Sequence, residues 1–174
     1  IKALGYPKFD LYKNHLKRFY KYRSLSINNH PYILINTHFG YSNSMHGLRR
    51  SFSLDWSYGP SIDEKINFTE LWADCMRYQS DYIILVHNIA KKFPDVNIII
   101  RPHPVECLDF YRIATSGLNN VMVSNESAVG CWFQNAIAVI HPQCTTSIEA
   151  DFFNTHIIQY SNKDVIKRHN TLTE

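Results

Sequence analysis

Strand-like apolar runs and helix-like stretches alternate through the second half of the chain, and no other feature constrains the fold as strongly. The apolar runs occupy residues 96–100, 121–123, 137–140 and 156–160, and the helix-like stretches between them occupy residues 108–114, 129–135 and 146–153. An earlier apolar run covers residues 32–36. Strands that alternate with helices over short loops form βαβ units, whose strands lie parallel. The sequence therefore predicts an α/β fold with a Rossmann-like parallel sheet and helices on both faces.

Two further helices are predicted before this alternation begins. Asp10 suits an N-cap position for a helix over residues 11–22. Apolar residues at three- and four-residue steps predict a long helix over residues 68–93, which Pro94 closes. Residues 48–61 carry no such period, and we expect an irregular segment there.

Length and composition favour a single domain over residues 1–174. With 174 residues, 45% of them hydrophobic, the chain can build a proper core, which excludes disorder. Its apolar runs are far shorter than the roughly 20 residues that cross a bilayer. Four cysteines without CxxC spacing indicate reduced, mostly buried thiols and a cytoplasmic protein. Because the chain starts at Ile1 without an initiator Met, we expect it to be part of a longer, two-domain protein.

The charge is nearly balanced, with 18 Lys and Arg against 15 Asp and Glu, so we expect no nucleic-acid partner. The basic excess gathers at residues 8–23 and 163–168, where a solvated helix face is favoured over a patch that rests on an anionic membrane or polysaccharide. We leave a peripheral membrane association open. Nine histidines form no HExxH motif and no close His/Cys cluster, so no metal site is predicted.

The first polar motif is Arg101–Glu106, with the sequence RPHPVE, directly after a predicted strand. Ligands of open parallel sheets bind beyond the carboxyl ends of the strands. Two prolines stiffen the loop around His103 and remove two amide donors. A guanidinium binds phosphate through two hydrogen bonds, and an imidazole adds a donor that can carry charge. We favour a phosphate site at Arg101 and His103 over a rigid loop whose histidine bonds only to the backbone.

The second polar motif is the segment 141–150, with the sequence HPQCTTSIEA, after another predicted strand. Its hydroxyl residues Thr145, Thr146 and Ser147 begin a helix, where free amides and the helix dipole favour an anion. Glu149 lies about one turn into that helix, where a carboxylate can accept hydrogen bonds from ribose hydroxyls. Alone, the motif reads as a capping box from Thr146 to Glu149. Two such loops at one sheet edge favour a pocket for a nucleotide mono- or diphosphate.

A third polar loop, residues 36–43 with the sequence NTHFGYSN, follows the first strand and offers contacts to a sugar or a phosphate. A polar loop without a role is nearly as well supported. The chain holds neither a GxGxxG fingerprint nor a GxxxxGK[ST] loop. Trp56, Trp72 and Trp132 are expected in the core rather than as stacking platforms.

Four segments together resemble the bacterial surface carbohydrate biosynthesis proteins. They are residues 5–10 (GYPKFD), 33–40 (ILINTHFG), 101–106 (RPHPVE) and 144–150 (CTTSIEA). That family is similar to GT-B glycosyltransferases and, more distantly, to Kdo transferases, bacterial sialyltransferases and CDP-glycerol glycerophosphotransferases. The chain departs from the family pattern at Lys8, where Arg is usual, at His38, where Asn is usual, and at residues 141–143 and 154–156.

The resemblance implies that the chain is the C-terminal, donor-binding domain of a GT-B fold. It places the donor phosphate on Arg101, His103, Pro104, Thr145, Thr146 and Ser147. It places the ribose on Glu149, and we expect sugar contacts from Asn36, Thr37 and Glu106. His103 is the catalytic candidate, since it can donate a proton to the departing phosphate.

The function that the resemblance implies is glycosyl transfer from a nucleotide-activated sugar, with a CMP-sugar favoured, in the synthesis of a surface polysaccharide such as capsule or lipopolysaccharide. The acceptor would be a glycan or a lipid-linked glycan at the inner face of the membrane, and no cofactor is expected. The alternatives are a CDP-glycerol-type polyol-phosphate transferase, a non-catalytic truncated GT-B module and a nucleotide-sugar epimerase.

Overall fold

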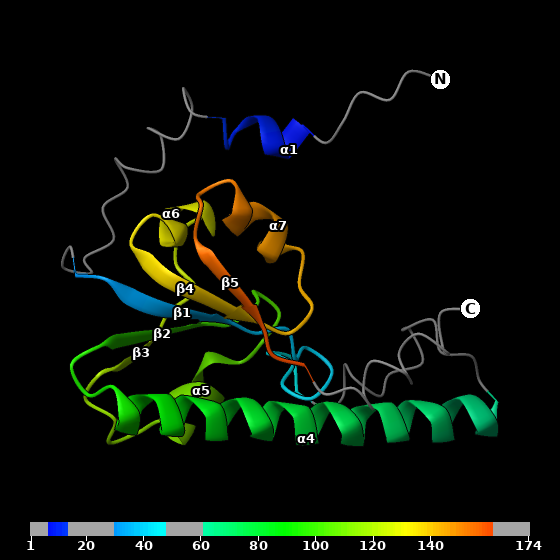
Figure 1. The fold of residues 1–174 in the computed structure, drawn as a ribbon. Coiled ribbons are helices and arrows are strands. Elements are labelled where there is room, and N and C mark those ends of the chain that lie inside the picture. Colours follow the sequence, from blue (N-terminus) through cyan, green and yellow to red (C-terminus); the bar gives the residue numbers. More distant parts are fainter. Residues whose placement is uncertain (1–6, 14–29, 48–60, 162–174) are drawn as a thin grey trace, which may run out of the picture.

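The computed structural model describes residues 7–13, 30–47 and 61–161, and within them a parallel sheet forms the centre of the molecule (Figure 1). Its five strands lie in the order β3-β2-β1-β4-β5. The strands are β1 (Tyr32–Asn36), β2 (Asn97–Arg101), β3 (Val121–Val123), β4 (Ala136–His141) and β5 (His156–Gln159). The order reverses between β1 and β4, as in doubly wound α/β folds. The predicted α/β, Rossmann-like fold is thereby confirmed.

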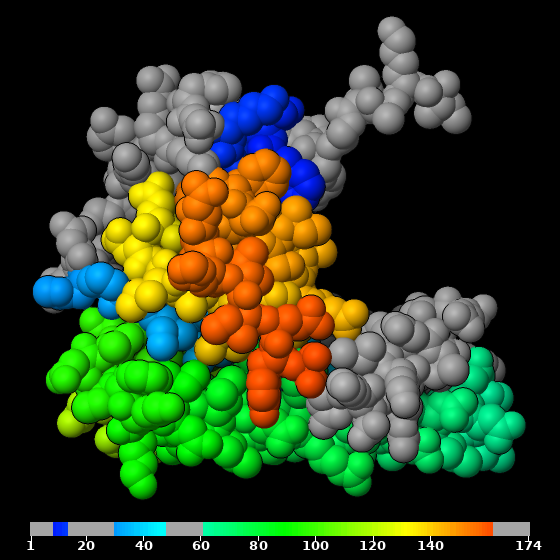
Figure 2. Space-filling model, in the orientation of Figure 1, coloured from blue at the N-terminus to red at the C-terminus, as the bar shows by residue number. Residues whose placement is uncertain are grey.

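Helices cover both faces of the sheet. The described helices are α1 (Pro7–Asp10), α4 (Ile62–Lys92), α5 (Leu108–Ala114), α6 (Gly130–Phe133) and α7 (Thr146–Asp151). Figure 1 shows α4 and α5 on one side of the strands and α6 and α7 on the other. The short helix α1 lies on the side of α7, and Figure 2 shows the two in contact. There the ring of Phe9 lies 5.4 Å from that of Phe152.

Each face of the sheet has its own core, because successive side chains of a strand point to opposite faces. Ile98 and Ile100 of β2 pack with tyrosines of α4 and α5, whereas Ile99 between them packs with Trp132 of α6. Burial on both faces explains why the strands read as continuous apolar runs. The core position expected for Trp132 is confirmed, Trp72 is only half-buried, and Trp56 lies outside the described residues.

Each predicted strand end lies within one residue of the observed end. The shifts at the ends of two strands matter for the site. The strands β2 and β4 each run one residue further than predicted, so Arg101 and His141 are strand residues rather than loop residues. The helices α6 and α7 are shorter than predicted.

At the N-terminus, the expected N-cap role of Asp10 is wrong. This residue ends α1, and residues 11–13 form a turn. The rest of the helix expected there lies outside the described residues. So does the irregular segment expected over residues 48–61, except for Ser61, which precedes α4.

The long helix α4 begins six residues earlier than the predicted residue 68, because a capping box fixes its start. The Ser61 hydroxyl accepts the amide of Glu64 at 3.2 Å, and the Glu64 carboxylate accepts the amide of Ser61 at 3.1 Å. Such reciprocal bonds satisfy two backbone donors that a helix start otherwise leaves open.

Removing this cap is expected to lower the stability of the domain. We expect Ser61→Ala to reduce the free energy of unfolding by about 1 kcal/mol in a urea titration. Ser80→Ala is the control, because the exposed Ser80 hydroxyl lies inside the same helix and donates to the carbonyl of Met76. Alanine there favours the helix, so the control loses no stability. An equal loss in both variants would contradict the capping role.

The four cysteines were predicted to be reduced and mostly buried. All four cysteines are free, as predicted, but only Cys75 is buried, whereas Cys107, Cys131 and Cys144 are half-buried.

None of the described helices combines the length and the hydropathy needed to cross a membrane. Among the described residues, no group of three or more His, Cys, Asp or Glu side chains is arranged to hold a metal ion.

Candidate functional site

Three neighbouring strands end in polar side chains that form one row. Asn36 of β1 is in register with Arg101 of β2. His141 of β4 follows Ile140, which is the partner of Ile35 in β1, so it lies level with Asn36. All three side chains belong to the sheet face that α6 and α7 cover. The row spans the place where the strand order reverses, which is where open α/β sheets bind their ligands.

The helix α7 brings the second motif to this row. The Asn36 amide Nδ2 donates a hydrogen bond to Oγ1 of Thr146 at 3.1 Å, which joins the end of β1 to the start of α7. Glu149, one turn further, lies close enough to Arg101 to influence its ionisation. The structure therefore brings Arg101, Thr146, Glu149 and Asn36 together, although 110 residues separate Asn36 from Thr146.

Two polar atoms of this row are buried without a hydrogen-bond partner among the described residues. They are Nε of Arg101 and Oδ1 of Asn36. The Arg101 group Nη2 donates to the carbonyl of Ser127 at 3.2 Å. Burial lowers the pKa of Arg101, and the carboxylate of Glu149 acts against this effect. An unpaired buried polar atom costs about 1–3 kcal/mol, so the row is an energetically unfavourable arrangement that a polar ligand would complete.

Glu106 lies in the interior and holds the Arg101–Glu106 loop in place. It is 1% exposed. Its carboxylate accepts hydrogen bonds from the Thr37 hydroxyl at 3.0 Å, the His103 amide at 3.0 Å and the Tyr111 hydroxyl. Burial raises the pKa of Glu106, and these hydrogen bonds act against that effect. The structure thus gives Thr37 and Glu106, both predicted as sugar contacts, buried positions beneath the loop.

His103 is half-buried above Glu106. Its Nδ1 accepts the amide of Val105 at 3.3 Å, so in the neutral ring Nε2 carries the hydrogen and acts as a donor. Burial lowers the pKa of His103, and the nearby His38 and Arg101 lower it further. The imidazole is therefore a hydrogen-bond donor rather than a cation at neutral pH while no anion is bound.

The start of α7 differs from the expectation of free amides and a capping box. The amides of Ser147 and Ile148 already donate to the carbonyls of Cys144 and Thr145, at 3.1 Å each. Instead of capping the helix, the Thr146 hydroxyl accepts from Asn36, and the Ser147 hydroxyl donates to the Cys144 carbonyl. Thr145 and Pro104 are exposed. The contribution of α7 to the site is therefore made by side chains more than by its dipole.

Two members of this cluster are absent from the predicted set. His141 is buried, and its Nδ1 accepts the amide of Cys144 at 3.1 Å. Burial lowers its pKa, so its Nε2 is a second neutral donor. Tyr12 donates its hydroxyl to the Glu149 carboxylate. The end position of His141 on a strand could have indicated its role, whereas nothing in the sequence near Tyr12 points to Glu149.

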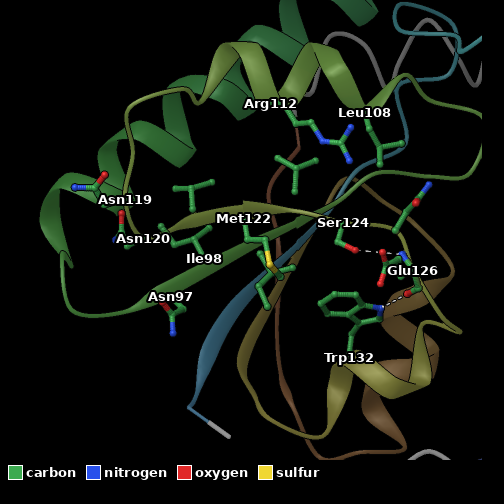
Figure 3. A pocket seen from close by; sticks show the side chains of 14 residues that line it. Asn97, Ile98, Leu108, Arg112, Asn119, Asn120, Met122, Ser124, Glu126 and Trp132 are labelled. Atoms are coloured by element: carbon green, nitrogen blue, oxygen red, sulfur yellow. Dashed lines mark hydrogen bonds between the residues drawn. The ribbon is translucent and has the colours of Figure 1, made fainter. Parts of the chain in front are cut away.

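A cavity of about 630 Å³ lies elsewhere, along the edge strand β3. Figure 3 shows Arg112 and Leu108 on one side of the edge strand and Trp132 on the other. The polar groups that line this cavity stabilise the fold. The side-chain amide of Asn120 donates to three backbone carbonyls, and the Trp132 indole donates to the carbonyl of Glu126. Since it holds no unsatisfied polar side chain among the described residues, the row at the strand ends is the better candidate site.

In comparisons with protein-family models, with curated proteins and with solved structures, this chain has no match.

Proposed function

We propose that the domain binds the phosphate of a nucleotide-activated sugar at the row of Arg101, Asn36 and His141, as the donor-binding domain of a GT-B glycosyltransferase. The observation that carries the proposal is the Asn36–Thr146 hydrogen bond, which joins the end of β1 to the second motif, with buried, unsatisfied atoms of Arg101 and Asn36 beside it. A desolvated guanidinium with an unused donor suits a phosphate oxygen. The resemblance of the motifs supplies the sugar and the transfer reaction.

The chemistry is the stabilisation of a leaving group. When the bond between the sugar carbon and the phosphate oxygen breaks, the electron pair stays on that oxygen and negative charge grows there. Arg101 and the Nε2–H of His103 would donate hydrogen bonds to this charge, in a site that is already oriented and partly shielded from water. A CMP-sugar is the favoured donor for this mechanism. In the alternative, transfer of a polyol phosphate from a CDP-linked donor, the bond that breaks is a phosphorus–oxygen bond.

Glu149 is the proposed ribose contact, and the structure sets a condition on it. This carboxylate is 4% exposed and accepts the hydroxyl of Tyr12. A ribose hydroxyl would therefore replace the Tyr12 hydroxyl, so binding of the nucleoside requires Tyr12, in the turn after α1, to move.

Calorimetric titration of this chain with CMP, CDP, UDP and GDP tests the proposal. We expect a cytidine nucleotide to bind selectively and His103→Ala to weaken that binding about tenfold, the effect of one charge-assisted hydrogen bond. His156→Ala is the control, because His156 is exposed at the amino end of β5, away from the site. Its affinity should equal that of the wild type.

Either of two outcomes would contradict the proposal. One is the absence of heat for all four nucleotides at millimolar concentration with a folded chain. The other is a cytidine affinity that is unchanged in His103→Ala.

A further inference from the structure

A second histidine stands beside His103. The ring centroids of His38 and His103 are 5.0 Å apart, with the planes tilted by 44°. His38 follows β1, and His103 follows the neighbouring strand β2, so both lie at the carboxyl edge of the sheet. His38 is exposed and His103 half-buried, so the pair is open to a ligand from solvent.

Backbone hydrogen bonds hold the two loops that carry these rings close together. The Met45 amide donates to the carbonyl of Val105 at 2.8 Å, and the Cys107 amide donates to the carbonyl of Asn43 at 3.0 Å. These bonds join the loop after β1 to the loop after β2. At Gly40 the loops come so close that a Cβ atom would lie 2.8 Å from the Val105 side chain. The two histidines are therefore held beside one another by a rigid pair of loops.

Several charged and titratable groups of the described residues lie near the pair. Arg101 of β2 acts on His103 and is itself in electrostatic contact with Glu149 of α7. Glu106 lies beneath the loop and accepts the amide of His103. The other titratable groups near Arg101 are Tyr12, Cys131 and Cys144. Arg101 is thus a cation near His103, and its charge disfavours a proton on that ring and attracts an anion.

We propose that His38 and His103 together clamp one phosphate group of the nucleotide ligand, and that the pair takes up a proton from solvent when the phosphate binds. This inference rests on the proposed function and adds a residue, His38, to its site. The proton forms a new N–H bond on one imidazole, and no covalent bond of the ligand changes.

The direction of the pH dependence follows from charge. In the free domain, burial, His38 and Arg101 lower the pKa of His103, which disfavours the imidazolium. A bound phosphate adds negative charge and raises that pKa. Since the bound state then holds more protons than the free state, affinity rises as the pH falls through the range between the two pKa values. An imidazole titrates near neutral pH, so this range is accessible to measurement.

The test is calorimetric titration with CMP in buffers of different ionisation enthalpy, which gives the number of protons taken up. Each titration is run both with and without EDTA. We expect His38→Asn to reduce proton uptake and to weaken CMP binding about threefold near about pH 6, with a smaller loss near about pH 8. The phosphate of free CMP titrates near about pH 6, and this titration cancels in the ratio of the two affinities because both proteins bind the same ligand.

His46→Asn is the matched control, because His46 is an exposed histidine of the same loop. It should keep the wild-type affinity and proton uptake. If the wild type binds CMP and His38→Asn matches it in both quantities, the histidine clamp is wrong while the proposed function stands. If the wild type binds no nucleotide, the proposed function fails first. Binding that disappears only when EDTA is present indicates a metal ion between the rings and also overturns the clamp.

Discussion

Glu106→Ala is expected to lower the free energy of unfolding by about 3–5 kcal/mol, the cost of removing one partner from a buried charged network. The reason is the number of donors that converge on this carboxylate. The hydroxyls of Thr37 and Tyr111 and the amides of His103 and Phe39 all bond to it. Without the carboxylate these buried donors lose their acceptor. Urea titration followed by circular dichroism measures the loss.

The control for this prediction is Glu126→Ala, since Glu126 is an exposed acidic residue. Its stability should lie within about 0.5 kcal/mol of the wild type, as is usual for surface substitutions. A loss of similar size in both variants would mean that the hydrogen-bond network of Glu106 contributes little.

Glu106→Gln adds a pH test of the same network. Because burial raises the pKa of Glu106 in the folded state, the folded chain holds this proton more tightly than the unfolded chain does. The wild type therefore loses stability as the pH rises from the unfolded value of about 4.3 through the raised folded value. Glutamine does not titrate, so the stability of the wild type relative to Glu106→Gln should increase as the pH falls. A constant difference would show that the environment of the carboxyl does not disfavour its charge.

The sheet could be predicted from the sequence because its signals are local. The run Tyr32–Asn36 is apolar on both faces and is preceded by Pro31, and the structure gives it the predicted bounds. The rule that ligands bind beyond the carboxyl ends of parallel strands also sufficed to expect the two motif loops at one edge. The start of α4 was missed although its signal is equally local, since the Ser61–Glu64 capping box is visible in the sequence.

The details of the site depend on contacts between distant residues, and these could not be predicted. A carboxylate after a polar motif suggests an exposed ligand contact, because Glu is rarely buried without a partner. The partners of Glu106 include Thr37, which is 69 residues away, and Glu149 is bound by Tyr12, which is 137 residues away. The pairing of His38 with His103 follows only from the register of β1 and β2.

Arg101→Met is expected to weaken the binding of a cytidine nucleotide about 100-fold, the value of two charge-assisted hydrogen bonds. Arg101→Lys keeps the charge but loses the planar fork, so its loss should be about tenfold. Methionine loses the hydrogen bond to the Ser127 carbonyl and the positive charge beside Glu149, but it also removes a buried donor that has no partner among the described residues. Because these effects oppose one another, the free energy of unfolding should change by only about 1 kcal/mol. Calorimetric titration gives the affinities, and urea titration gives the stabilities.

The control for Arg101 also decides between the row at the strand ends and the cavity beside β3. Arg112 is an exposed arginine that pairs with Asp109 and lines the cavity beside β3 (Figure 3). Arg112→Met should bind the nucleotide as the wild type does. If Arg112→Met loses the nucleotide and Arg101→Met retains it, the ligand lies along the edge strand and the row at the strand ends is structural. A large loss of both stability and affinity in Arg101→Met would mean that the buried guanidinium mainly stabilises the fold. A loss of affinity alone identifies it as a ligand contact, which the folded domain maintains at an energetic cost.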